Sequence, residues 1–252
     1  MITVCFNAEK YIEQTIRSVL TQKNCDIEYV IIDGASTDKT ISIIECYKEK
    51  VTKWVSEPDD GIASAMNKGV SLSTGDYLLF LHADDYFVDE NALSRAVRCM
   101  TEGRDIYAFD IYFQTDAEQI RRSTKPFGVR TYFKTPVMHQ GAFCKRTLFH
   151  SLNGFDERFK IAMDYDFFFR AYKSHASMEI HSQVLSVMRD TGVSSMTDWP
   201  SLKRRFSEER CVHNKNCSST PMSHIYDLYW MLYLPFRYVT YNLKLGKKWL
   251  LL

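Results

Sequence analysis

The chain lacks the sequence features that define several protein classes. Its seven cysteines are odd in number, scattered, and form no C-x-x-C pair, so we expect reduced thiols and a cytoplasmic protein. No apolar run is long enough to span a bilayer. Met1 leads straight into an apolar segment at Ile2–Phe6, so we expect no signal peptide. The net charge of +1 gives no basis for a nucleic-acid surface.

Glycine-rich phosphate loops are also missing. The segment that follows the first predicted strand, Asn7–Lys10, contains no glycine. An NAD-dependent dehydrogenase needs G-x-G-x-x-G at that point. A sugar nucleotidyltransferase needs a glycine-rich basic loop there to hold a triphosphate. The sequence therefore argues against both classes.

The length and composition are those of a globular enzyme-sized protein. The 252 residues are 45% hydrophobic and 25% charged, which is ordinary for a globular fold and enough for one large α/β domain with a helical appendage. The pattern contains no internal repeat and no low-complexity linker.

Strands and helices are predicted to alternate in the first part of the chain. The predicted strands are Ile2–Phe6, Ile27–Ile32, Thr52–Ser56 and Tyr77–Leu81, and the helices between them are Glu9–Gln22, Asp38–Lys50 and Ile62–Leu72. Such alternation indicates parallel strands with helical crossovers. We therefore predict an α/β fold with a Rossmann-like, mostly parallel central sheet flanked by helices, in which residues 1–110 form the nucleotide-binding half.

The pattern changes after a fourth predicted helix at Asn91–Met100. Predicted strands follow at Ile106–Phe113, Gln119–Ser123, His139–Cys144 and Glu179–Met188, and helices at Arg146–Leu152 and Asp164–Lys173. The first two of these strands alternate polar with apolar residues and are predicted to be antiparallel. We assign residues 111–195 to an acceptor and catalytic half, and residues 196–252 to a C-terminal helical extension with helices near Trp199–His213 and Ser223–Leu245.

Acidic residues stand where the predicted strands end. Asp33, Asp59 (or its neighbour Asp60) and the pair Asp84-Asp85 all occupy such exits, so they should gather along one edge of the sheet. Two adjacent carboxylates are costly to hold together unless a cation neutralises them, and Mg²⁺ or Mn²⁺ prefers such oxygen ligands. The alternative is that Asp84 and Asp85 are turn residues that cap the helix beginning near Glu90. The joint placement of the acids favours a site.

Seven motifs in a fixed order carry a resemblance to a known family. They are Asn7–Glu9, Ile31–Thr40, Ser56–Ile62 with Ala65–Gly69, Leu81–Asp85, His139–Gly141, Gly154–Asp156 and Asp164–Phe167. The chain resembles a bacterial family 2 glycosyltransferase of the GT-A fold, of the type that builds polysaccharides and O-antigen. The resemblance covers about Ile2–Ser195. Each motif alone is weak, and their order is what makes the match specific.

The resemblance implies roles for individual residues. It implies contacts with a nucleotide sugar at Asn7, Asp33, Asp59, Asn67, Lys68, Asp84, His139 and Gln140. Asp33 matches the acid that accepts a hydrogen bond from the base, usually uracil. Asp85 matches the ligand of Mn²⁺ or Mg²⁺, and Asp164 matches the catalytic base. From the residues alone, Asp164 could equally be the N-cap of its helix, Asp33 a turn acid, His139 a structural histidine and Lys68 a solvated helix residue.

The chain departs from the family pattern in three places. His82 stands where the family often has Asn or Asp, and Ala63-Ser64 stands where it often has Tyr-Asp. The second change removes a carboxylate from the sugar pocket and alters the expected donor choice. Met163 replaces the acid that usually precedes the catalytic Asp, which leaves Asp164 itself in place.

The resemblance implies an inverting glycosyltransferase with a metal ion at the leaving diphosphate. The donor would be a nucleoside diphosphate sugar, with uridine favoured and guanosine or thymidine open, and the sugar a hexose or N-acetylhexosamine. The acceptor would be a glycan or lipid-linked glycan for the cell surface. Nucleic acid is not an expected partner. A non-catalytic nucleotide-sugar binding subunit is the second hypothesis, and the presence of both Asp85 and Asp164 argues against it.

The C-terminal segment allows two interpretations. Residues 226–252 are rich in Tyr, Trp and Leu, with Arg237, Lys244, Lys247 and Lys248 among them. That composition suits peripheral contact with the inner face of the cytoplasmic membrane. The alternative is a helix packed on the main domain with its aromatic stripe buried.

Overall fold

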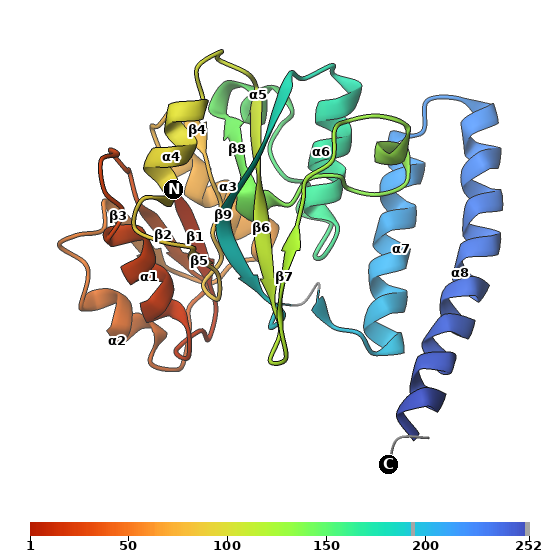
Figure 1. Ribbon diagram of the computed structural model, residues 1–252, viewed down its shortest axis with the longest axis horizontal. Helices are drawn as coiled ribbons and strands as arrows, with labels where there is room; N and C mark the ends of the chain where they lie inside the picture. The colour runs from red at the N-terminus through yellow and green to blue at the C-terminus, as the bar shows by residue number, and fades with distance from the viewer. Residues whose placement is uncertain (193–194, 250–252) are drawn as a thin grey trace. The chain divides into compact units, whose positions relative to one another are not determined.

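The structure is a computed structural model that describes residues 1–192 and 195–249, with side chains as far as Leu243. The chain divides into two compact units, Met1–Gly192 and Val193–Leu252 (Figure 1). The division of residues 1–195 into two halves stays a prediction.

The first unit begins with the predicted alternation. Its first elements are β1 (Ile2–Cys5), α1 (Ile12–Leu20), β2 (Val30–Asp33), α2 (Thr40–Glu45), β3 (Lys53–Ser56), α3 (Ile62–Leu72) and β4 (Tyr77–Leu78). β1 pairs with β2 and β2 with β3, both in parallel. The predicted strand Tyr77–Leu81 is regular only as far as Leu78. Its apolar continuation still runs beside β1, because Ile2 bridges Phe80 in parallel and donates from its N–H to the Leu79 carbonyl at 2.9 Å.

The second part of the unit completes a mixed sheet. It comprises β5 (Tyr86–Phe87), α4 (Ala92–Cys99), β6 (Ile106–Gln114), β7 (Gln119–Arg122), β8 (Ala142–Lys145), α5 (Arg146–Ser151), α6 (Met163–Lys173) and β9 (Met178–Arg189), with 3₁₀ turns η1 (Val129–Tyr132) and η2 (His139–Gly141). The strands follow the order β4-β8-β6-β9-β5, and β7 pairs antiparallel with β6 as predicted. The expected strand His139–Cys144 is wrong in its first half, because His139–Gly141 forms the turn η2 and the strand begins at Ala142.

The two faces of β2 show how the layers form. Side chains of a strand alternate between faces. Ile31 belongs to the apolar core that includes Ile12 and Ile16 of α1. Ile32 points the other way, toward α3, where a Cβ on Gly69 would lie 3.5 Å from its side chain and 2.5 Å from Ile2. Because Gly69 has no Cβ, α3 can lie directly on β1, so helices cover both faces of the parallel strands.

The second unit is a helical hairpin, α7 (Trp199–Asn216) followed by α8 (Thr220–Trp249). Its aromatic contacts pair early residues of one helix with late residues of the other, so the helices are antiparallel: Trp199 meets Tyr238 with ring centroids 4.9 Å apart, and His213 stacks on Tyr226 at 4.3 Å. The Trp230 indole N–H donates to His213 Nδ1 at 2.9 Å. Within this unit, the buried aromatic stripe of α8 thus packs on α7.

None of the helices in the described residues is both long and apolar enough to cross a membrane.

Candidate active site

The parallel register places several strand exits at one level. Cys5 of β1, Asp33 of β2 and Ser56 of β3 are direct neighbours across the sheet. Ile2 pairs with Phe80, so the chain reaches the level of Cys5 three residues later, at Ala83. The exits that carry Asp33, Asp59 and Asp84-Asp85 therefore lie along one edge of the sheet, which is the side where ligands bind in open α/β sheets.

Asp33 is enclosed by donors from the protein. Its carboxylate is fully buried and accepts hydrogen bonds from the Ser36 N–H at 2.9 Å, the Ser36 hydroxyl at 2.5 Å and the Ser56 hydroxyl at 2.7 Å. The Cys5 thiol, whose pKa is raised by burial and by Asp33, approaches the same carboxylate at 3.5 Å. Both oxygens are occupied, so Asp33 holds the loop after β2 in shape. A direct hydrogen bond to a base stays a prediction and requires a serine to turn away.

Asn7 and Asp59 border the same loop. Asn7, with φ of 48°, donates from its backbone N–H to the Ser36 hydroxyl at 2.8 Å and accepts from the Thr37 N–H at 2.9 Å. Asp59 lies against Gly34, where an added Cβ would meet its carboxylate at 2.8 Å. Its other oxygen accepts from the Gly61 N–H at 2.8 Å. The structure thus brings together Asn7, Asp33 and Asp59.

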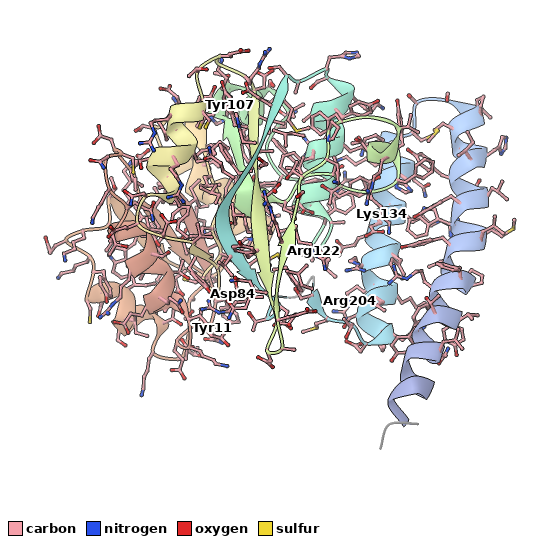
Figure 2. All side chains as sticks on the ribbon, in the orientation of Figure 1. Tyr11, Asp84, Tyr107, Arg122, Lys134 and Arg204 are labelled. Carbon is pink, nitrogen blue, oxygen red and sulfur yellow. The ribbon has the colours of Figure 1, made fainter. Side chains whose placement is uncertain are left out.

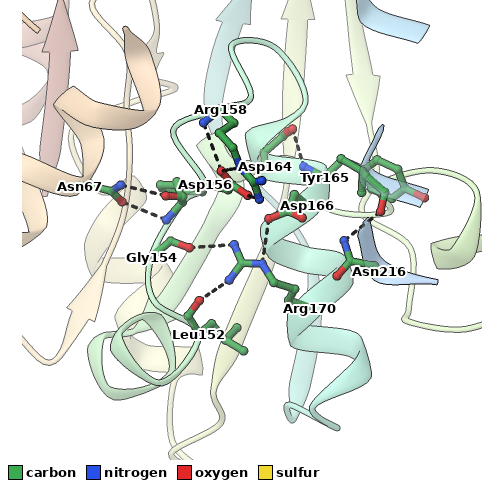
Figure 3. A network of polar contacts seen from close by, with 12 residues as sticks. Asn67, Leu152, Gly154, Asp156, Arg158, Asp164, Tyr165, Asp166, Arg170 and Asn216 are labelled. Atoms are coloured by element: carbon green, nitrogen blue, oxygen red, sulfur yellow. Dashed lines mark hydrogen bonds and ion pairs between the residues drawn. The ribbon is translucent and has the colours of Figure 1, made fainter. Parts of the chain in front are cut away.

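The Asn67 and Lys68 side chains both have polar partners within the protein. The Asn67 amide donates to the Phe155 carbonyl and to Glu157, each at 2.9 Å, and its oxygen accepts from the Phe155 N–H. Lys68 pairs with Glu57 at 2.8 Å. These hydrogen bonds of Asn67 connect α3 to the segment that precedes α6 (Figure 3). Their predicted place in the wall of a nucleotide-sugar pocket stays a prediction.

Asp84 and Asp85 lie in different surroundings despite being neighbours. Asp85 is buried, and one of its oxygens accepts from the Arg189 N–H at 3.2 Å. Burial, and then the charge of Asp84, raise the pKa of Asp85 well above its ordinary value, against the opposing hydrogen bonds from the Arg189 N–H and the Gln140 side chain. Asp84 accepts from the Thr191 hydroxyl at 2.5 Å.

The divalent cation predicted at this pair stays a prediction. A cation would relieve the cost of the buried charge at Asp85. In the described part of the chain no cluster of three or more His, Cys, Asp or Glu side chains could hold a metal. A site with two carboxylates suits Mg²⁺ or Mn²⁺, which take one or two carboxylates and complete their shell with water and phosphate oxygens.

Arg189, at the end of β9, contacts the turn that carries Asp84 and Asp85. Its guanidinium donates to the Asp84 carbonyl and to Gln14. It lies 4.4 Å from the ring centroid of Tyr11 and 4.6 Å from that of Tyr86; Tyr11 and Asp84 are labelled in Figure 2. The sequence reasoning gave Arg189 no role. Its place at the end of a predicted strand is the only signal in the sequence, which does not reveal that Arg189 contacts a residue 104 positions away.

Asp164 stands in the first turn of α6. The N-cap of that helix is Ala162, so the N-cap alternative for Asp164 is wrong. One carboxylate oxygen accepts from the Tyr165 N–H at 2.6 Å, and the other lies 3.6 Å from Nδ1 of His139. The Asp164 side chain keeps 23% of its surface exposed. The carboxylate is therefore partly accessible to a substrate.

His139 and Gln140 connect the two acidic centres. The Gln140 side chain hydrogen-bonds Asp85, and its carbonyl accepts from the Ser186 hydroxyl at 2.7 Å. The His139 ring lies beside Asp164 on one side and meets the His82 ring edge-on at 4.7 Å. Burial, with a smaller contribution from His139, lowers the pKa of His82 to about 3, so His82 is neutral. Nε2 of His139 is buried with no hydrogen-bond partner among the described residues.

Other motif residues hold the head of α6 in place. Asp166, fully buried, pairs with Arg170 at 2.8 Å. The Arg170 guanidinium also donates to the Leu152 carbonyl and to the Gly154 carbonyl. Figure 3 shows this clamp between α6 and the turn before it. Asp164 and Asp166 thus have different roles although only Tyr165 separates them.

Comparisons with known proteins agree with the geometry. The model of the family "Glycosyl transferase family 2" matches residues 1–179. An uncharacterized glycosyltransferase of Mycobacterium tuberculosis is 31% identical over 202 residues, covering 77% of this chain and 76% of the relative. A PGL/p-HBAD biosynthesis glycosyltransferase of Mycobacterium bovis is 30% identical over 218 residues, covering 81% of this chain and 82% of the relative.

Solved structures show the same fold. S. aureus TarS 1-349 in complex with UDP-GlcNAc has a TM-score of 0.68 at 22% identity, over 88% of this chain and 68% of that one. With the UDP complex of TarS 1-349 the chain spans 63% of its length. The mannosyltransferase PcManGT from Pyrobaculum calidifontis, in complex with GDP-Man and Mn²⁺, has a TM-score of 0.66 at 18% identity, over 98% of this chain and 73% of that one. The predicted α/β fold of the GT-A type with C-terminal helices is confirmed.

Proposed function

The chain belongs to glycosyltransferase family 2, and on that basis we propose that it transfers a sugar, with inversion, from a nucleoside diphosphate sugar to a glycan or lipid-linked glycan. Uridine is the favoured donor nucleotide. The acceptor would lie at the inner face of the cytoplasmic membrane, and the product would enter a cell-surface polysaccharide such as O-antigen.

One observation carries the proposal. Asp85 and Asp164 belong to one connected cluster, because the adjacent residues Gln140 and His139 contact one of them each. A reaction that moves a sugar between a diphosphate and a hydroxyl needs a centre for the leaving anion next to a centre for the incoming proton. The two carboxylates would supply these centres, and residues of the turn η2 contact both of them.

Asp85, with Asp84 beside it, would hold Mn²⁺ or Mg²⁺, and the metal when bound would neutralise the charge that develops on the diphosphate. The Mn²⁺ named with PcManGT supports this assignment. Arg189 and Gln140 keep the Asp85 carboxylate in position through their hydrogen bonds.

Asp164 would take the proton of the acceptor hydroxyl as that oxygen attacks the sugar. Its side chain is partly exposed, which makes this possible, and the half-buried imidazole of His139 beside it limits how the carboxylate can rotate. A single displacement with one base on the acceptor side inverts the anomeric carbon. The preformed site contributes by aligning the reactants.

The donor side rests on Asn7, Asp33 and Asp59, which gather at the sheet edge next to Asp84. UDP-GlcNAc and GDP-Man in the neighbouring structures support a nucleotide sugar as the donor. Ala63, buried in α3, and Ser64 replace the bulkier pair common in the family, so we expect room for a larger sugar substituent.

The test is a screen of nucleotide sugars with Mn²⁺, read as thermal stabilisation and as transfer to lipid-linked glycan extracts. A ligand at a hundredfold excess over its dissociation constant stabilises a single site by ~2.7 kcal/mol. We expect one donor to stabilise the protein and to be turned over. Asp164→Asn should bind that donor without transfer, whereas Asp116→Asn, at an exposed turn, should behave like the wild type. Binding without turnover in the wild type would instead indicate a non-catalytic binding subunit.

A further inference from the structure

The helix α8 exposes an unusual number of large apolar side chains. Twelve such side chains are strongly exposed in the described residues, and eight of them lie on α8, each between 48% and 63% exposed. The eight are Ile225, Leu228, Met231, Leu232, Phe236, Tyr238, Val239 and Leu243. Isolated exposed apolar residues are ordinary on protein surfaces, whereas a contiguous group marks an interaction surface.

Six of the eight form a single line along the helix. Ile225, Leu228, Leu232, Phe236, Val239 and Leu243 follow one another in steps of three or four residues, which is the spacing of one helix face. We call these six residues the outer row. The contacts with α7 use other α8 residues, among them Tyr226, Trp230 and Tyr233. The hairpin is therefore held together without the outer row.

The outer row carries no charge over most of its length. Between Leu228 and Leu243 the sequence has one charged residue, Arg237. Its guanidinium lies 5.1 Å from the ring centroid of Phe206 on α7 and donates to the Tyr233 hydroxyl at 2.8 Å. It is thus engaged with the hairpin interior, and the face that carries the outer row stays apolar.

Positive charge is concentrated in the same unit. Residues 193–252 contain nine Lys or Arg against four Asp or Glu, a net charge of +5, while residues 1–192 contain 23 against 27, a net charge of −4. In the sequence the outer row is followed closely by Lys244, Lys247 and Lys248, whose side chains lie outside the described residues. The two parts of the chain thus have net charges of opposite sign, although the net charge of the whole chain is only +1.

We propose that the outer row lies in the surface of an anionic phospholipid bilayer, with α8 parallel to the membrane plane and the basic residues of its unit near the headgroups. An apolar helix face combined with excess positive charge is the chemistry of an interfacial helix. The outer row is the surface through which the proposed enzyme reaches a membrane-bound acceptor. That role rests on the proposed function, but the binding itself does not.

Two other occupants fit the observations less well. A second copy would bring a second unit of net charge +5 against the first, which like-charge repulsion disfavours. The first unit offers no matching apolar surface, because its strongly exposed large apolar side chains in residues 1–192 are Phe6, Val97 and Val129, far apart in the chain. The bilayer satisfies both the apolar row and the charge.

The experiment is co-sedimentation of the full chain with vesicles, without donor or acceptor. Vesicles of phosphatidylcholine with phosphatidylglycerol are compared with vesicles of phosphatidylcholine alone, at low and high salt. The test variant carries Leu232→Gln, Phe236→Gln and Val239→Gln. The matched control carries Val97→Gln and Val129→Gln, which remove exposed apolar side chains elsewhere. Circular dichroism and thermal melting verify that each variant is folded.

We expect the wild type and the control to bind the anionic vesicles, and the test variant to bind at least about tenfold more weakly, because three apolar anchors are lost. Binding of the wild type should weaken with salt and on neutral vesicles. Equal binding by the folded test variant, or no binding by the wild type, would overturn the proposal. So would light scattering in which the wild type is a dimer and the test variant a monomer. None of these readouts depends on sugar transfer, so failure of the proposed function would be seen separately.

Discussion

Two carboxylates of the candidate site, Asp33 at the end of β2 and Asp164 in the first turn of α6, differ in their surroundings. Each follows an apolar segment of the sequence. Asp33 accepts hydrogen bonds from three groups of Ser36 and Ser56 and is fully buried. Asp164 has one close backbone donor and a partly exposed side chain. The difference teaches that a carboxylate whose oxygens are all engaged by protein donors shapes the site, while a less engaged and partly exposed one can act on a substrate.

The largest expected effect is the loss of activity when Asp164 is replaced. Asp164→Asn keeps the size of the side chain but removes the proton acceptor, so kcat should fall about 10²- to 10⁴-fold. The free energy of unfolding should change little, because the carboxylate is partly solvated. Steady-state kinetics with the donor found in the screen, together with urea unfolding, measure both quantities. Full activity in a folded Asp164→Asn protein would show that the base lies elsewhere.

A sharper comparison lies on the same helix. Asp166→Asn removes the buried charged partner of the largely buried Arg170 guanidinium, and breaking a buried pair costs about 3–5 kcal/mol. Glu90→Gln, which breaks an exposed pair with Lys23, should cost less than about 1 kcal/mol. Urea unfolding of both variants measures the difference. Equal losses would mean that the Arg170 clamp does not hold α6.

The enclosed carboxylate is the next test. Asp33→Asn places an amide N–H₂ against donors from Ser36 and Ser56, so we expect a loss of about 1–3 kcal/mol in the free energy of unfolding. If Asp33 only shapes the loop, Ser56→Ala should weaken donor binding in parallel with stability. If Asp33 binds the base, as the family resemblance implies, donor affinity in calorimetry should fall much more for Asp33→Asn than for Ser56→Ala. The pair of variants separates the two roles.

The sequence predicted which residues lie at the edge of the sheet better than it predicted the hydrogen-bond partners of those residues. The alternation of elements sufficed for the exits of β1, β2 and β3, because parallel strands with helical crossovers must end on the same side. It could not show that Asn67 would bond to Phe155, 88 residues away. Such contacts depend on how α3 packs against the later part of the chain, and a local sequence pattern does not contain that information.

Two further misses have local physical causes. His139–Gly141 has the apolar and polar pattern of a strand, but Gly141 passes so close to the Phe109 carbonyl that a Cβ there would lie 2.5 Å from it, and the chain turns at that point. The C-terminal helix was expected either to lie on a membrane or to bury its aromatic stripe on the main domain. Within its own unit it buries one stripe on α7 and exposes another, a division that composition alone does not reveal.

The smallest expected effect concerns His82, whose ring meets the His139 ring edge-on. Burial holds the pKa of His82 at about 3 in the folded chain, against about 6.5 in an unfolded one. The unfolded state therefore binds the proton first, and the stability that neutral His82 permits is fully present above about pH 6.5 and is lost as the pH falls toward 3. Between pH 7 and pH 5 the loss should be about 2 kcal/mol.

His82→Gln should remove this loss, so its free energy of unfolding should fall less than that of the wild type between pH 7 and pH 5. His175→Gln, at an exposed site after α6, is the matched control and should follow the wild type. Urea unfolding at the two pH values measures the difference. A wild type and a His82→Gln protein with the same pH dependence would mean that His82 already accepts a proton in the folded chain.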